Sequence, residues 1–195
     1  MTAAYRINEV FYSLQGEGFF TGTPSLFIRF AGCNLQCPFC DTSHADARRM
    51  TLEEIVREAA QCPARHVVLT GGEPSLQADG VLVDELHALG KFVAVETNGT
   101  HALPKGIDWV TLSPKDTFVR HADIVLSRCD ELKVVFDGTP PPPYSAIETS
   151  HRFLQPCDTG NAAQNQKILS AAVDFMKAHP QWRLSLQTHK FIGIR

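Results

Sequence analysis

The sequence lacks any segment that would cross a membrane or direct secretion. No apolar run approaches the roughly 20 residues that span a bilayer. The first ten residues, MTAAYRINEV, lack the basic and apolar regions of a signal peptide. We therefore expect a cytoplasmic protein with no membrane partner, and its six cysteines are not expected to form disulfides in a reducing compartment.

The sequence also lacks a concentration of charge of one sign. It has 18 Lys and Arg against 21 Asp and Glu among 195 residues, and no basic or acidic block stands out. A protein surface that binds nucleic acid usually needs a basic excess, so we expect no direct nucleic-acid partner. No internal repeat is present and the length suits one domain, so we expect residues 1–195 to form a single domain.

What the sequence does contain is a series of apolar runs typical of strands. Several are nearly continuous in apolar character, as in strands of a parallel sheet that are buried on both faces. They cover residues 10–13, 26–32, 66–71, 92–97, 109–113, 132–136, 152–155 and 183–187.

Apolar stripes with helical spacing lie between some of these runs, at residues 52–59, 82–89 and 168–176. A capping box of Thr51 and Glu54 precedes the first stripe, and we expect the connection from Thr42 to Thr51 to be a loop. The alternation predicts an α/β fold with a parallel sheet. Three helices are too few for a complete eight-fold barrel, which typically takes about 250 residues. We therefore predict a shortened, open (partial) parallel β/α barrel.

Five of the predicted strands end in polar groups and tight-turn residues. These endings are residues 71–74, 96–99, 113–115, 155–156 and 187–189. In barrels the functional site lies at the carboxyl ends of the strands, so the five endings together predict one ligand site.

Three cysteines follow the predicted strand at 26–32, in the spacing Cys-x3-Cys-x2-Cys: Cys33, Cys37 and Cys40. Zinc usually takes four protein ligands in structural sites. His44 could supply the fourth, but no second Cys-x2-Cys pair exists. Thiolates also favour iron–sulfur clusters, and three cysteines on a four-iron cluster leave one iron open for a ligand. The spacing alone does not decide between these two sites.

The wider motif does favour one of them. The cysteine spacing, with the aromatic Phe39 just before the last cysteine, resembles the signature of radical S-adenosylmethionine (SAM) enzymes. In that superfamily the open iron chelates the methionine part of SAM. The segment TGGEP, Thr70 to Pro74, resembles the superfamily motif whose glycines lie beside the amino group of SAM. The resemblance implies a 4Fe-4S cluster and a partial barrel of the radical SAM type.

A narrower resemblance runs nearly end to end. The sequence is similar to the family of 7-carboxy-7-deazaguanine synthases at residues 12–18, 27–42, 69–77, 95–99, 112–115, 131–135, 153–156 and 180–190. The resemblance implies a lyase that converts 6-carboxy-5,6,7,8-tetrahydropterin to 7-carboxy-7-deazaguanine with loss of ammonia, on the route to queuosine and other 7-deazapurines. A 5′-deoxyadenosyl radical would take hydrogen from C6 of the substrate. The implied cofactors are a 4Fe-4S cluster, S-adenosyl-L-methionine and Mg²⁺. The implied partners are a flavodoxin or ferredoxin as electron donor and a second copy in a homodimer.

The same resemblance assigns residues to the site, position by position. Cys33, Cys37 and Cys40 would bind the cluster, and Thr42 would bind Mg²⁺. The residues along SAM would be Phe39, Cys40, Asp41, Gly72, Ser113, Pro114, Lys115, Gln155, Pro156, Cys157 and Asp158. The substrate would contact Leu14, Gln15, Gly16, Glu17, Arg29, Thr70, His189 and the terminal carboxylate of Arg195. No side chain would be catalytic, because the cofactor carries the radical.

Several polar side chains raise separate questions. Arg29 lies among apolar neighbours on a predicted strand, and an unpaired buried arginine would be costly, so it needs an anionic partner. That partner is the substrate carboxylate on the resemblance, or a carboxylate of the protein in a structural ion pair. Lys133 also lies in an apolar strand and needs a partner, but no role is assigned to it. Glu96 would support the cofactor region, together with Asn98.

Three rival interpretations remain. One is a radical SAM activase that acts on another protein, although residues 13–18 and the THK segment at 188–190 resemble the synthases. The second is a non-enzymatic zinc-binding module. The third is an iron–sulfur electron carrier, which would want a fourth cysteine in the loop.

Overall fold

The fold was determined as a computed structural model that describes residues 4–40, 42 and 47–195. The strands are β1 (Ala4–Leu14), β2 (Pro24–Phe30), β3 (Arg48–Thr51), β4 (His66–Gly71), β5 (Phe92–Thr97), β6 (Trp109–Leu112), β7 (Arg128–Phe136), β8 (Glu148–Pro156) and β9 (Arg183–Leu184). The helices are α1 (Leu52–Gln61), α2 (Gly80–Ala88), α3 (Ala162–Ala178) and α4 (Thr188–Ile192), with a short 3₁₀ helix, η1 (Pro74–Leu76).

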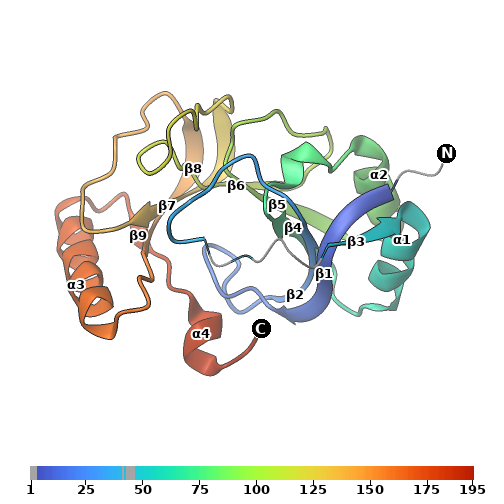
Figure 1. The fold of residues 1–195 in the computed structure, drawn as a ribbon, viewed down its shortest axis with the longest axis horizontal. Helices are drawn as coiled ribbons and strands as arrows, with labels where there is room; N and C mark the ends of the chain where they lie inside the picture. Colours follow the sequence, from blue (N-terminus) through green and yellow to red (C-terminus); the bar gives the residue numbers. More distant parts are fainter. Residues whose placement is uncertain (1–3, 41, 43–46) are drawn as a thin grey trace.

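All the strands belong to one curved sheet, in the order β3-β1-β2-β4-β5-β6-β7-β8-β9 (Figure 1). Neighbouring strands from β2 to β9 are parallel, whereas β1 is antiparallel to both β2 and β3. The sheet ends at β3 on one side and at β9 on the other, so among the described residues the barrel is not closed. This arrangement confirms the predicted open, partial parallel β/α barrel.

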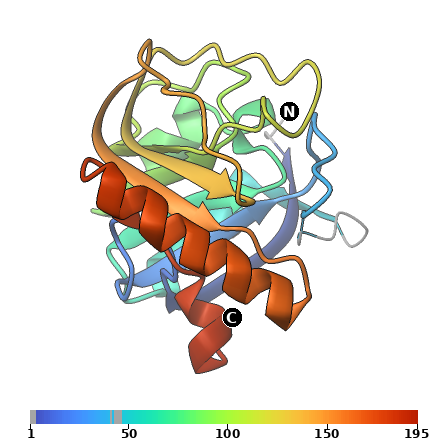
Figure 2. The ribbon, with the colours of Figure 1, turned by 90° about the vertical axis from the view of Figure 1, so that its left-hand side faces the viewer.

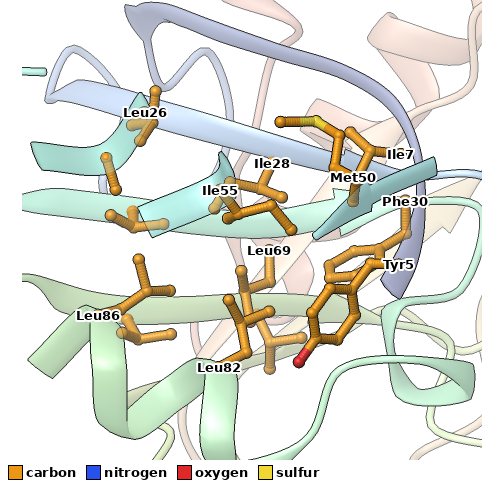
Figure 3. Packing of buried hydrophobic residues seen from close by; sticks show 14 residues of the cluster. Tyr5, Ile7, Leu26, Ile28, Phe30, Met50, Ile55, Leu69, Leu82 and Leu86 are labelled. Atoms are coloured by element: carbon orange, nitrogen blue, oxygen red, sulfur yellow. The ribbon is translucent and has the colours of Figure 1, made fainter. Parts of the chain in front are cut away.

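The outer face of the sheet carries two hydrophobic cores. One packs α1 and α2 against β1, β2, β4 and β5, around residues such as Ile28, Leu69 and Leu82 (Figure 3). The other packs α3 against β7 and β8 (Figure 2). Ile168, Ala172 and Leu154 are among its buried residues. No helix of the described residues is long and apolar enough to cross a membrane.

The inner face carries the alternate residues of the same strands, because successive side chains of a strand point to opposite faces. On β4, Val67 and Leu69 belong to the outer core, whereas His66, Val68 and Thr70 line cavities on the inner side. Strands β5, β6 and β7 follow the same rule. Polar side chains, among them Thr70, Glu96, Ser113 and Lys133, thus gather inside the barrel near the carboxyl ends of the strands.

Most predicted elements are present, and three differ. The predicted capping box is formed by Thr51 and Glu54 at the start of α1. The segment 42–51, expected to be a loop, instead contains β3, whose residues pair with the start of β1. The strand expected at 183–187 has only the two residues of β9. Gln187 then precedes α4, a short helix that no apolar stripe had predicted.

Candidate active site

A cavity of ≈690 Å³ opens at the carboxyl ends of the parallel strands. It is lined by almost every residue that the sequence assigned to a cluster, to SAM, to Mg²⁺ or to substrate: Leu14, Gln15, Gly16, Glu17, Arg29, Cys33, Cys37, Phe39, Cys40, Thr42, Thr70, Gly72, Ser113, Lys115, Gln155, Pro156, Cys157, Asp158, His189 and Arg195. Pro114 is not among the lining residues. Asp41 and His44 lie outside the described residues. The volume is in the range of small-molecule sites.

The loop after β2 presents the three clustered cysteines to this cavity. All three are free thiols. Burial raises the pKa of the Cys33 and Cys37 thiols, and the neighbouring thiols of the group raise both further. Within residues 4–40, 42 and 47–195, no group of three or more His, Cys, Asp or Glu side chains is arranged to hold a single metal ion. In a four-iron cluster each cysteine binds its own iron, so the thiols need not meet at one point. The three thiols on one wall of the cavity fit such a cluster.

The turn after β4 packs directly against the cysteine loop. Gly72 Nα donates a hydrogen bond to Phe30 O at 3.0 Å, and Glu73 Nα donates one to Gly32 O at 2.9 Å. A Cβ atom at Gly72 would collide with the Gly32 carbonyl, so only glycine fits there. This close approach brings the backbone of the GGEP turn beside the expected cluster.

The side chain of Glu73 also holds this turn in place. Its carboxylate is fully buried. It accepts hydrogen bonds from Thr97 Oγ1 at 2.6 Å, from Asn98 Nα at 2.7 Å and from Ser75 Nα at 3.0 Å. Because these bonds join the end of β4 to the end of β5, the turn has one defined position relative to the cavity.

Lys115 brings a buried amine to the cysteine side of the cavity. Its Nζ donates to Ser113 O at 2.7 Å and to Ser113 Oγ at 2.6 Å. Burial lowers the pKa of Lys115 to about 8, against the opposing effect of Cys37. The predicted Ser113–Lys115 segment therefore forms a compact polar wall facing the thiols.

The floor of the cavity is a buried ion-pair network centred on Lys133. Its Nζ lies 2.6 Å from Glu17 Oε2 and 3.3 Å from Glu96 Oε1. Glu96 also accepts from Gln15 Nε2 and from Thr70 Oγ1, both at 3.1 Å. Burial by itself would raise the pKa of Glu17, but the charge of Lys133 and hydrogen bonds outweigh it and lower that pKa to about 2. Burial would lower the pKa of Lys133, but Glu17 and Glu96 raise it. Both groups are therefore charged at neutral pH.

Arg29 has a protein partner in this structure. Its Nε donates to Glu9 Oε1 at 2.8 Å, and the Arg195 guanidinium pairs with the other oxygen of Glu9. Both guanidinium groups also lie over the Phe11 ring, at 5.8 Å and 5.3 Å from its centroid. The anionic partner that the sequence required for Arg29 is thus at least partly supplied by β1.

The C-terminal segment crosses the mouth of the cavity and returns to β1. Thr188 Nα donates to Gly16 O at 2.9 Å, and Ser13 Oγ donates to Arg195 O at 2.7 Å. Gly16 has no Cβ, which leaves room for the His189 ring beside it. The predicted substrate residues of the two chain ends therefore lie side by side.

Several cavity residues were not assigned to the site from the sequence. They are Asn8, Glu9, Phe11, Phe27, Leu35, Gly71, Thr97, Val135, Gly160, Gln187 and Lys190, and Lys133 was noticed without a role. Glu9 and Phe11 are directly opposite Arg29 and Phe27 in the β1–β2 ladder. Sequence reasoning could have found them if the predicted first strand had been extended back to Glu9. Alternate side chains of a strand point to the same face, so Glu9 and Phe11 share one face of this strand, as Phe27 and Arg29 do on the next.

Comparisons with known proteins agree with this geometry. A family model described as "Radical SAM superfamily" matches residues 27–128. The 7-carboxy-7-deazaguanine synthase of Bacteroides thetaiotaomicron is 53% identical over 190 residues, which cover 97% of this chain and 98% of that protein. The one from Bradyrhizobium diazoefficiens is 41% identical, covering 98% of this chain and 100% of that protein. Among solved structures, the crystal structure of QueE from Escherichia coli superimposes with a TM-score of 0.75 at 31% identity, covering 95% of each chain.

Proposed function

Because the chain belongs to the 7-carboxy-7-deazaguanine synthases of the radical SAM superfamily, we propose that it converts 6-carboxy-5,6,7,8-tetrahydropterin to 7-carboxy-7-deazaguanine with loss of ammonia. Membership of the superfamily implies a 4Fe-4S cluster and SAM as cofactors. The observation that carries the proposal is that, Pro114 apart, all the described residues expected for the cluster, for SAM and for the pterin line one cavity, although they are scattered from Leu14 to Arg195.

In this proposal the chain's own residues bind and orient. Cys33, Cys37 and Cys40 would hold the cluster, and the cluster together with SAM would supply the radical chemistry that removes hydrogen from C6 of the substrate. SAM would lie along Phe39, Cys40, Gly72, Ser113 to Lys115 and Gln155 to Asp158, and along Asp41, which is outside the described residues. The Thr42 hydroxyl binds Mg²⁺, a hard cation that prefers oxygen ligands and keeps several waters.

The floor and one wall of the cavity suit the two ends of the pterin. Glu17 and Glu96 present carboxylate oxygens, and Gln15 presents an amide, so together they can accept from the amino and N–H groups of the pyrimidine edge. The guanidinium of Arg29 can pair with the substrate carboxylate in the two-pronged geometry that arginine favours. Glu9 then remains as the shared partner of Arg29 and Arg195. Leu14, Gly16, Thr70 and His189 complete the contacts.

The remaining assignments belong to the same proposal. We propose that residues 1–195 act as one radical SAM domain, since one sheet runs through both hydrophobic cores. We also propose that a flavodoxin or ferredoxin reduces the cluster and that the enzyme is a homodimer.

The test is an anaerobic assay of the protein reconstituted with iron and sulfide. Reductant, SAM, Mg²⁺ and 6-carboxytetrahydropterin are added, and the products are identified by mass spectrometry. Formation of 7-carboxy-7-deazaguanine, with little net consumption of SAM, supports the proposal. Accumulation of 5′-deoxyadenosine and methionine without the deazaguanine would leave a radical SAM enzyme with another substrate. Failure to take up any iron–sulfur cluster would contradict the proposal and favour the zinc-binding module.

Arg29→Met tests the substrate assignment within this assay. It removes the cation proposed for the substrate carboxylate, so we expect KM for the pterin to rise about tenfold or more while cluster content and cleavage of SAM persist. Arg57→Met, on the exposed face of α1, is the control and should leave all three unchanged. An unchanged KM in Arg29→Met would place the carboxylate elsewhere in the cavity.

A further inference from the structure

A second, much smaller cavity lies directly behind the floor of the first. Its volume is ≈10 Å³, and it shares Gln15, Glu17 and Glu96 with the large cavity. The remaining lining includes His66, Trp109 and Glu131 on three inner strands. Cavities of about this size hold one water molecule when enough polar groups surround it.

Three buried polar atoms on residues that line this small cavity have no hydrogen-bond partner among residues 4–40, 42 and 47–195. They are His66 Nε2, Trp109 Nε1 and Glu131 Oε1. A buried polar atom without a partner typically costs about 1–3 kcal/mol, and nearly all such atoms in native proteins are paired with protein or ordered water. Three of them around one cavity therefore point to a ligand.

The surrounding hydrogen bonds limit the donor and acceptor roles of these atoms. Ser25 Oγ lies 2.9 Å from Thr23 O and 2.7 Å from His66 Nδ1, and its single proton can be donated to either. Burial lowers the pKa of His66, so the ring is neutral, and its Nε2 accepts or donates according to which way the Ser25 hydroxyl turns. The indole Nε1–H of Trp109 is a donor that faces the Glu131 carboxyl. Burial raises the pKa of Glu131 and the indole opposes that rise, but the two groups make no direct hydrogen bond of normal geometry. Glu131 accepts from Phe19 Nα through Oε2 at 3.1 Å, which leaves Oε1 as the second acceptor.

A single water molecule both donates and accepts, so it can satisfy all three atoms with three hydrogen bonds, the usual number for buried water. We propose that one ordered water occupies the small cavity, accepts from Trp109 Nε1, donates to Glu131 Oε1 and is hydrogen-bonded to His66 Nε2. Through Glu131 this water holds in place the loop that carries Glu17 into the active site. If the Glu131 carboxyl takes up a proton, its O–H donates to the same water, and His66 Nε2 then accepts from that water.

The link to the active site runs through the loop between β1 and β2. Phe19 Nα is bonded to Glu131, and Gly18, at φ +64°, has no Cβ that would collide with the Glu131 carboxyl. Gly18 Nα donates to Ser185 Oγ at 2.9 Å. Because Glu17 directly precedes these two anchored residues, a displaced Glu131 carboxyl would move Glu17 away from Lys133. His66, Trp109 and Glu131 are therefore positioning residues.

The direct test is a high-resolution crystal structure of the cluster-containing enzyme, grown anaerobically without ammonium salts so that density in the cavity cannot be ammonia. We expect one peak within hydrogen-bond distance of all three atoms. An empty cavity, or a direct hydrogen bond between Trp109 Nε1 and Glu131 Oε1 that closes it, would overturn the proposal.

Variants test the effect on the loop. His66→Phe removes the polar Nε2 atom while keeping an aromatic ring, and we expect several-fold faster hydrogen exchange at the amides of Gly18 and Phe19. His151→Phe is the matched control, because His151 contacts Phe19 and Trp109 on the same side of the barrel but does not line the small cavity. Equal exchange in His66→Phe and wild type would overturn the positioning role. If His66→Phe does not fold, Glu131→Gln is measured in the same way, and the crystal structure of the wild type decides the water itself.

Hydrogen exchange and the density are independent of the proposed function. A KM for the pterin that rises several-fold in His66→Phe with little change in kcat would connect the loop to substrate binding. If the wild type forms no deazaguanine, the crystal structure still decides whether the water is present, and the exchange experiment still decides its effect on the loop.

Discussion

At the scale of single residues, the charge of the site is set by Lys133. One buried ammonium lies between two carboxylates, so the ion-pair network has one more carboxylate than ammonium groups. In the proposed function the excess carboxylate oxygens face the N–H groups of the pterin. Removing one partner of a buried ion pair typically destabilises a protein more than replacing both, because it leaves a charge buried without compensation. We therefore expect the stability of the protein to depend on pH through this network.

Glu17→Gln tests that pH dependence. The pKa of Glu17 is lowered from its ordinary value of 4.5 to about 2. At pH values above 4.5 the charged carboxylate therefore stabilises the folded state in full, and this contribution is lost as the pH falls toward 2. We expect the free energy of unfolding of cluster-free wild type to drop more steeply from neutral pH to about pH 3 than that of the variant. Urea unfolding across this range measures both slopes.

Glu53→Gln is the control for this series, because Glu53 is exposed on the first turn of α1. Its slope should match that of wild type. Parallel slopes for wild type and Glu17→Gln would contradict the assignment of the acid sensitivity to the Lys133 network.

The cysteines make a second prediction at this scale. Cys37→Ala removes one of three thiols on the cavity wall, so we expect the reconstituted protein to lose most of its bound iron and its brown colour. Cys62→Ala should keep both, since Cys62 lies at the end of α1, outside the cavity. Iron and sulfide analysis of the two variants measures the difference. Equal iron in both variants would mean that the thiol of Cys37 is not a cluster ligand.

At the scale of elements, the site depends on how closely two loops approach each other. The cysteine loop follows β2 and the GGEP turn follows β4, and these strands are parallel neighbours. Their carboxyl ends must therefore lie side by side. The hydrogen bonds of Gly72 and Glu73 to the end of β2 then fix the distance between the expected cluster and the expected SAM site.

Gly72→Ala should disturb this contact without unfolding the protein. The added Cβ would meet the backbone carbonyl of Gly32, which cannot move away like the end of a flexible side chain. We expect SAM binding to weaken about tenfold or more while the circular dichroism spectrum stays that of wild type. Gly80→Ala is the control, because a Cβ at that helical position meets open space. SAM affinity is measured by equilibrium dialysis. Equal affinity in the two variants would show that the two loops can move apart without weakening SAM binding.

The elements also show where reading the sequence reached its limit. The parallel strands from β2 to β8, together with α1, α2 and α3, could be predicted because each contributes apolar residues to a core. β3 and α4 could not, because α4 has no buried residue and β3 has one. Backbone pairing with β1 forms β3, and contacts at the mouth of the cavity position α4. A periodicity of side chains cannot reveal elements that are held in these ways.

At the scale of the whole molecule, the two ends of the chain complete the site together. β1 supplies Glu9 and the loop with Glu17, and the last nine residues supply Gln187, His189 and Arg195. Gln187 Nε2 donates to Glu17 Oε1 at 3.2 Å, so the C-terminal segment also contacts the floor. None of these C-terminal residues belongs to either hydrophobic core.

Truncation after Leu186 should therefore separate folding from binding. We expect the melting temperature to change little, because no buried apolar contact is lost, while KM for the pterin rises about tenfold or more. Phe191→Ser is the control, since Phe191 is exposed in α4 and does not line the cavity. Thermal unfolding and steady-state kinetics of the two variants give both values. An unchanged KM after truncation would mean that the C-terminal segment takes no part in substrate binding.

The sequence by itself determined the chemistry of this protein. The spacing of the cysteines, the GGEP turn and the polar strand ends are local patterns. Each can be recognised from neighbouring residues alone, without knowledge of the tertiary structure. The tertiary structure decided which charges meet: Glu9 with Arg29 and Arg195, and Lys133 with Glu17 and Glu96. It also placed the three buried polar atoms on residues around one small cavity. The charged partners are separated by up to 186 residues along the chain. The register and curvature of the sheet, the loop between β1 and β2 and the path of the C-terminal segment bring them together, and no short stretch of sequence encodes these.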